Sequence, residues 1–191
     1  NADSFIGAMR YHMASFMAPS QQVAMNELSN HDHSRFLTRT NHRVGRMDHF
    51  DYDAASDGVN PAVMREAVVM QMTWPGAPTV YYGDEAGVCG FTDPDNRRTY
   101  PWGHEDTQML EFHREIIAQH KAHPVFTGGS LQFLMGDYNC LAYGRFDARE
   151  KMVVVFNNNG EDRDLTIKVW PAEVEANQKL RRIFFTDGAG Y

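Results

Sequence analysis

The sequence predicts an α/β domain followed by an all-β domain. Up to residue 123, helical and strand-like segments alternate, and each strand-like segment leads into a long polar loop. This alternation is typical of parallel βα units. After Pro124 the chain changes to short β-prone runs separated by Gly, Asn and Asp turns, which predicts antiparallel strands. We therefore expect one domain at residues 1–123 and a second at 124–191.

Three segments of the first domain carry apolar residues at helical spacing. The first helix has Asp3 or Ser4 as a candidate cap. The second has Asn60 as its cap and Pro61 at its first position, a combination that favours helix initiation. The predicted helices cover residues 4–17, 60–72 and 106–120.

The strand-like segments fall into two groups. In the first domain they are "QVAMNEL" (22–28), which also fits a short helix, and "TVYY" (79–82), which lies between Gly and Pro residues. In the second domain we expect five antiparallel strands: "SLQFLM", "CLAYGRF", "KMVVVF", "DLTIKVW" and "RRIFF".

Composition is that of a globular protein, with 42% hydrophobic and 23% charged residues among 191. The net charge of -7 and the scattered basic residues argue against nucleic acid or an anionic membrane as the main partner. No apolar run approaches the length of a membrane span. Cys89 and Cys140 are far apart, so we expect two free thiols, although a single disulfide is compatible with the sequence.

The stretch "ELSNHDHSRF" (27–36) concentrates titratable groups directly after an apolar run. It has three interpretations: a metal site at His31 and His33, a catalytic carboxylate at Asp32, or a solvated turn. In an extended chain the two histidines share a side and Asp32 faces away, but no third ligand is evident. A turn in which Asn and Asp satisfy backbone donors explains the stretch taken alone. Ligands of α/β folds, however, gather at this end of parallel strands.

A second polar cluster follows the next strand, in "GAPTVYYGDEAGVCGFTDPDNRRTYPW" (76–102). In its simplest interpretation the glycines form turns, and Asp84 and Glu85 lie in solvent. Yet both clusters are expected at the same edge of successive strands. Together with Tyr81, Tyr82 and Trp102 they supply the acids, arginines and aromatic faces that bind sugar rings.

Taken together, "SNHDHSRF" and "GAPTVYYGDE" resemble the α-amylase family of glycoside hydrolases at the ends of its seventh and eighth barrel strands. The extension "DPDNRRTYPW" is similar to the neopullulanase, cyclomaltodextrinase and amylopullulanase branch. The resemblance implies the last two βα units of a (β/α)8 TIM barrel, followed by an incomplete antiparallel β-sandwich domain. It also implies cleavage of α-glucosidic bonds in starch-type oligosaccharides such as maltodextrins, cyclodextrins and pullulan.

The resemblance also implies roles for individual residues. Asp32 would stabilise the transition state, and His31 would bind the sugar at the cleavage subsite. Asn30 would shape the loop, Arg35 would support the site, and Glu85 would be structural. Further sugar units would face a pair of residues in the following loop, Asp93 and Arg97. We expect no cofactor and no metal, and an α-glucan oligosaccharide as the partner.

A retaining glycosidase also needs a nucleophile and a general acid/base. In this family they lie on the fourth and fifth strands, upstream of these motifs. A whole barrel takes ~250 residues. We therefore expect a fragment that is inactive alone and self-associates, because barrel strands cut from their neighbours expose edges and apolar faces. The alternatives are a non-catalytic carbohydrate- or partner-binding relative and a small zinc protein.

Overall fold

The computed structural model describes all 191 residues, which form two compact units. Unit 1 contains Asn1–Met25, Thr73–Ala77 and His120–Ile183. Unit 2 contains Asn26–Met72, Pro78–Gln119 and Phe184–Tyr191. Both units combine segments from before and after residue 123, and the predicted domain boundary at that point stays a prediction.

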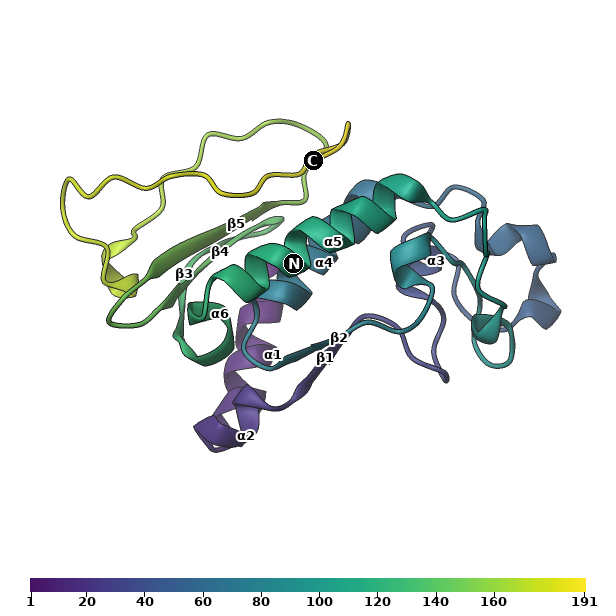
Figure 1. Cartoon of the computed structure of the whole chain (residues 1–191), viewed down its shortest axis with the longest axis horizontal. Helices are drawn as coiled ribbons and strands as arrows, with labels where there is room; N and C mark the ends of the chain where they lie inside the picture. The colour runs from purple at the N-terminus through teal and green to yellow at the C-terminus, as the bar shows by residue number, and fades with distance from the viewer. The chain divides into compact units, whose positions relative to one another are not determined.

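Unit 1 is built around an antiparallel sheet with the strand order β3-β4-β5 (Figure 1). Its strands are Ser130–Asp137, Cys140–Phe146 and Lys151–Asn157, which confirms three of the five predicted strands. A bulge between Phe133 and Met135 shifts the register of β3 against β4. The helices of this unit are α1 (Ala2–Ala14), α2 (Ala18–Gln22) and α6 (Val125–Gly128).

Helix α1 packs against β3, and its backbone joins the hairpin where Ala2 N donates to Tyr138 O at 2.6 Å. Its cap is not the expected Asp3 or Ser4. The side chain of Asn1 accepts a hydrogen bond from Ser4 N at 2.9 Å, because a cap serves the backbone N–H two or three positions further on.

The core of unit 1 gathers around Trp74, whose ring meets those of Phe5, Phe133 and Tyr143 at centroid distances of 5.3–5.8 Å. The Tyr143 hydroxyl lies 2.6 Å from Thr73 Oγ1. Burial lowers the pKa of the fully buried Arg145 to about 10, so this side chain stays protonated at neutral pH. Its guanidinium donates to the backbone carbonyls of Thr73, Gly129 and Ser130.

The two remaining predicted strands, at 164–170 and 181–185, are wrong. Side chains from residue 164 to 170 do alternate between exposed and half-buried, as the pattern predicted. No neighbouring strand pairs with them, however, and only a short 3-10 turn, η5 (Trp170–Ala172), forms there. A strand needs a neighbouring strand to bind its backbone N–H and C=O groups, so the alternating exposure of side chains was not enough to form one here. The sandwich stays a prediction, since one three-stranded sheet is present.

A second, two-stranded sheet pairs β1 (Met25–Glu27) with β2 (Ala77–Thr79). Strand β1 falls inside the predicted segment 22–28. Strand β2 ends at Thr79, earlier than predicted, and Val80 to Tyr82 already belong to the loop that leads to Asp84.

Two helices, α4 (Pro61–Thr73) and α5 (Thr107–Ala122), supply most of the core of unit 2. The predicted cap of α4 is confirmed, because Asn60 Oδ1 accepts from Ala62 N at 3.0 Å and Val63 N at 3.2 Å. None of the helices is long and apolar enough to cross a membrane. The buried residues of this core include Met64, Val68, Met72, Phe91, Met109, Phe112 and Ile116.

Short helical turns shape the loops that rest on this core. They are α3 (Phe36–Arg39), η1 (Met47–His49), η2 (Tyr52–Ala55), η3 (Asp84–Ala86) and η4 (Asp95–Arg97). The candidate site lies on the loops that precede α3 and η4 and on the segment around η3.

Candidate active site

The loop that follows β1 is held by the side chain of Asn30. Its Oδ1 accepts hydrogen bonds from Asp32 N at 2.9 Å and from His33 N at 3.0 Å, which closes an Asx turn. Its Nδ2 donates to Glu27 Oε1 at 2.7 Å. Asn30 is therefore anchored at both ends of its amide, and the backbone around Asp32 is fixed locally.

The side chains of His31 and Asp32 point outward, with 69% and 67% of their surfaces exposed. The loop bends between them, so His31 Nε2 lies 3.6 Å from Asp32 Oδ1, and Asp32 does not face away from His31 as an extended chain predicts. No three His, Cys, Asp or Glu side chains are arranged to hold a metal ion. This geometry offers an accessible carboxylate and imidazole on a fixed backbone.

Arg35 lies beneath this loop and is fully buried. Its Nη1 donates to Asp84 Oδ1 at 3.0 Å and to Tyr82 O at 2.6 Å, and its Nε donates to Asn96 O at 2.8 Å. The guanidinium carbon lies 4.1 Å from the Tyr81 ring centroid and 4.8 Å from that of Tyr82. One buried arginine thus connects three separate segments of unit 2.

Asp84 is buried, with 4% of its surface exposed, so the interpretation that placed it in solvent is wrong. The sequence could not reveal its partner, because Arg35 is 49 residues away. Burial raises the pKa of Asp84, while a hydrogen bond with Ser29 and the charge of Arg35 oppose the rise. Glu85 lies within the same turn, where its Oε2 accepts a hydrogen bond from Gly83 N at 2.9 Å.

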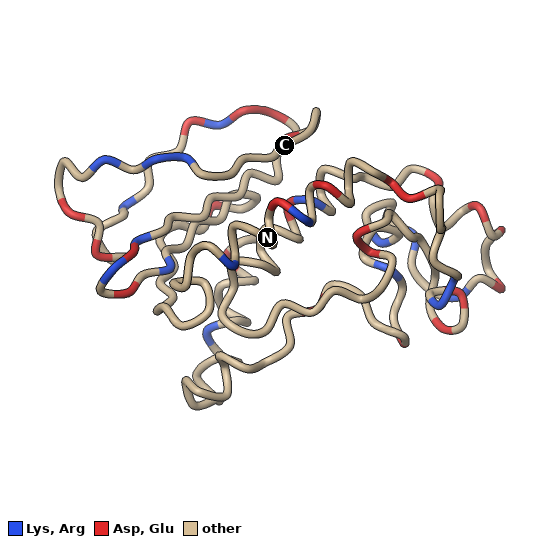
Figure 2. Tube along the Cα trace, in the orientation of Figure 1, with Lys and Arg blue, Asp and Glu red and all other residues tan.

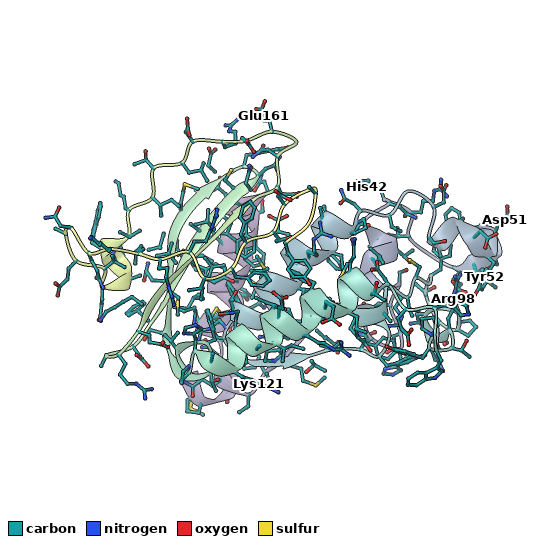
Figure 3. All side chains as sticks on the ribbon, turned by 45° about the horizontal axis from the view of Figure 1, so that its top comes forward. His42, Asp51, Tyr52, Arg98, Lys121 and Glu161 are labelled. Carbon is teal, nitrogen blue, oxygen red and sulfur yellow. The ribbon has the colours of Figure 1, made fainter.

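The segment around η4 presents the predicted pair Asp93 and Arg97, which contact each other as an ion pair with 46% and 49% of their side chains exposed. The neighbouring pair Asp95 and Arg98 faces inward. Asp95 accepts hydrogen bonds from Arg98 Nε and Arg98 Nη2, both at 2.9 Å. The guanidinium carbon of Arg98 lies over the Tyr52 ring, 3.7 Å from its centroid (Figure 3). This loop therefore has an outer pair available to a ligand and an inner pair that fixes it.

Asn96 joins the two loops. Its Nδ2 donates to Asn30 O at 3.1 Å and to His33 O at 2.9 Å. The structure thus brings together the predicted residues of the 30–35 and 93–97 segments. Sequence reasoning missed Asn96 and Asp84 as members of the site, since each reaches its partners across more than forty residues of chain.

Aromatic rings lie on the same segments. Tyr81 and Tyr82 meet at 4.8 Å, and Tyr100 and Trp102 meet at 4.4 Å between centroids. Trp102 is 79% exposed and Tyr82 is 41% exposed. Figure 2 shows basic and acidic residues dispersed over the chain. Exposed rings, a carboxylate and an Arg–Asp pair are the groups that bind the apolar faces and hydroxyl rims of sugars.

A family model described as the catalytic domain of α-amylase matches residues 3–187. The chain therefore belongs to the α-amylase catalytic-domain family. The fold and the motifs at residues 29–36 and 76–85 agree with this membership, and the small β1-β2 sheet is consistent with part of a barrel.

Individual proteins similar to this chain agree with its membership of this family. The chain is 36% identical over 129 residues, or 63% of its length, to an amylopullulanase of Thermoanaerobacter thermohydrosulfuricus, of which it covers 8%. It is 34% identical over 82% of its length to neopullulanase 2 of Thermoactinomyces vulgaris, of which it covers 25%. A cyclomaltodextrinase structure superposes with a TM-score of 0.70 at 29% identity, covering 83% of this chain and 25% of that one. The chain thus spans a quarter or less of these proteins.

Proposed function

We propose that this chain contributes to the active site of a retaining glycoside hydrolase that cleaves α-glucosidic bonds in starch-type oligosaccharides, including maltodextrins, cyclodextrins and pullulan. The observation that carries the proposal is the carboxylate of Asp32, which is exposed on a loop fixed by Asn30 and Asn96. Membership of the α-amylase family and the names of the relatives, amylopullulanase, neopullulanase and cyclomaltodextrinase, support it.

Asp32 acts as the transition-state stabiliser. Glycoside hydrolysis passes through an oxocarbenium-like state, in which hydrogen bonds to ring hydroxyls strengthen as positive charge develops. A carboxylate on a fixed backbone accepts such bonds without reorganising during the reaction. His31 Nε2, 3.6 Å from Asp32 Oδ1, is placed to bind a hydroxyl of the same sugar.

The outer pair Asp93 and Arg97 binds further sugar units. Both side chains are about half exposed and form an ion pair with each other, so a pair of sugar hydroxyls can replace that contact. Asn30 and Arg35 act through the loop, because the hydrogen bonds that their side chains make are to protein atoms.

Hydrolysis requires a nucleophile and a general acid/base in addition to Asp32. By resemblance these carboxyl groups belong to barrel strands that precede the motifs of this chain. We therefore expect the 191-residue chain to be inactive alone and a longer protein that contains it to be active. The share of each relative that the chain covers, 8% and 25%, supports this expectation.

The test measures release of reducing ends from cyclomaltodextrin and pullulan by the longer protein, by its Asp32→Asn variant and by the 191-residue chain. We expect Asp32→Asn to lower kcat by about a hundred- to a thousandfold, as for loss of a preorganised transition-state contact. Asp48→Asn is the matched control, because Asp48 is 65% exposed and also lies beside a histidine.

Other outcomes separate the alternatives. An Asp32→Asn variant that keeps most of its activity would exclude the assigned role. A longer protein that binds cyclomaltodextrin without cleaving it would instead be a carbohydrate-binding relative. Activity in the 191-residue chain that disappears with Asp32→Asn would mean that the remaining carboxylates lie within it.

We also propose that the isolated chain self-associates. Unit 1 exposes large apolar side chains around α1 and α2, with exposures from 60% to 77%. Burying such a surface is favourable. Sedimentation velocity between low and high protein concentration tests this, and a single monomeric species throughout would refute it. The residues concerned are Tyr11, Phe16, Met17, Val23 and Met25.

A further inference from the structure

We propose that Asn96 is a positioning residue that fixes the loop of Asp32 from below and couples it to the loop of Asp93 and Arg97. The inference rests on the proposed function for its kinetic consequence. Its structural part depends only on the hydrogen bonds of unit 2.

Both amide protons of Asn96 serve the Asp32 loop. Nδ2 donates to the carbonyls of Asn30 and His33, at 3.1 and 2.9 Å, and these residues bracket Asp32. The N–H groups of Asp32 and His33 are bound from the other side by Asn30 Oδ1. The turn is therefore held through its carbonyls by one asparagine and through its amides by another.

The orientation of the Asn96 amide follows from its partners. Two carbonyl oxygens face one end of the side chain, and only the NH2 group supplies two donors to them. The other end, Oδ1, is buried without a hydrogen-bond partner. Leaving a buried acceptor unpaired is unfavourable. The orientation of this side chain therefore leaves its own acceptor unpaired. It is explained by the two loop carbonyls that its NH2 group binds.

The backbone of Asn96 is also fixed. Its carbonyl accepts the hydrogen bond from Arg35 Nε at 2.8 Å, and the residue is fully buried within η4. Asp93 precedes this turn and Arg97 ends it. A sugar that binds Asp93 and Arg97 therefore contacts the element that sets the position of Asp32.

Asn41 provides a matched control. Its Nδ2 also donates to two backbone carbonyls, of Ala54 at 3.1 Å and Asp57 at 2.9 Å, but these belong to a different loop of unit 2. Asn41→Ala thus removes the same kind of contact without touching the Asp32 loop. Asn96→Ser, which keeps one donor, covers the case in which Asn96→Ala fails to fold.

The first measurement is amide hydrogen exchange at Asp32 and His33 in the 191-residue chain. We expect Asn96→Ala to accelerate exchange at both amides at least about tenfold, because the opposite side of their turn is released. Asn96→Ser should be intermediate and Asn41→Ala unchanged. Equal exchange in Asn96→Ala and Asn41→Ala would overturn the proposal.

The second measurement is kinetic, on the longer protein. We expect Asn96→Ala to lower kcat about 10- to 100-fold at nearly constant KM for a short maltodextrin, as for a displaced catalytic group. In an Asp32→Asn background the same substitution should cost less than threefold, because both changes act on one interaction. Full additivity of the two effects, or a kcat loss equal to that of Asn41→Ala, would overturn it.

The two proposals fail in different ways. If the unmodified longer protein cleaves neither cyclomaltodextrin nor pullulan, the proposed function is wrong, and the exchange experiment still decides whether Asn96 fixes the loop. If the enzyme is active but Asn96→Ala keeps full kcat, the proposed function stands and the positioning role is refuted.

Discussion

Replacing Arg35 by methionine tests whether the buried arginine organises unit 2. Methionine occupies a similar volume but removes the donors to Tyr82 O, Asp84 Oδ1 and Asn96 O. It leaves Asp84, which is 4% exposed, without its counter-ion. Breaking a buried ion pair by removing one partner costs about 3–5 kcal/mol, because the remaining charge is unpaired.

The expected loss is therefore about 3–5 kcal/mol of unfolding free energy. For a chain of this size, 1 kcal/mol corresponds to about 2–4 °C in Tm, so we expect a decrease of roughly 6–20 °C. Loss of the guanidinium, which contacts the rings of both Tyr81 and Tyr82, acts in the same direction.

The assay is urea unfolding followed by far-ultraviolet circular dichroism, whose helical signal includes α4 and α5. Arg43→Met is the control. Arg43 pairs with Asp57 at 2.8 Å, but the two side chains are 41% and 66% exposed. Such a surface pair contributes about 0–1 kcal/mol. If Arg35→Met and Arg43→Met destabilise the chain equally, the reasoning from burial is refuted.

Two further predictions concern the same region. Because the pKa of Asp84 is raised in the folded state, its ionisation opposes folding, and its contribution to stability declines as pH rises above the ordinary value of 3.8. The difference in unfolding free energy between Asp84→Asn and the unmodified chain should therefore shift in favour of the variant as pH rises from 4 to neutral, and parallel urea midpoints across that range would contradict this. Gly90→Ala should cost about 1–3 kcal/mol, because its Cβ would lie 2.6 Å from Asp95 O and 2.8 Å from Asn96 Cα, whereas Gly188→Ala, in open space, should be nearly neutral in the same unfolding assay.

Short sequence patterns correctly predicted several helices and strands. Asn60 and Pro61 identified the start of α4, and the β-prone runs after Pro124 identified β3, β4 and β5. The same reasoning failed at 164–170 and 181–185, where β-prone residues have no strand beside them. Pairing is a property of the neighbour, so a strand pattern read along one segment cannot establish it.

The candidate site likewise contains residues that sequence motifs predicted and residues that only the folded structure identifies. Asp32 and His31 were predicted as site residues from the resemblance of two motifs taken together, "SNHDHSRF" and "GAPTVYYGDE", because a turn explains the first stretch taken alone. Asn96, whose donors reach back 63 and 66 residues, has no such signal, because its role exists only once the two loops meet. A pair of motifs can thus indicate a residue that contacts the substrate, whereas a residue that holds another one in position is recognised only from the fold. Substitutions at Asn96 and Arg35 should therefore act through Asp32, and substitution of Asp32 itself should act with the loop intact.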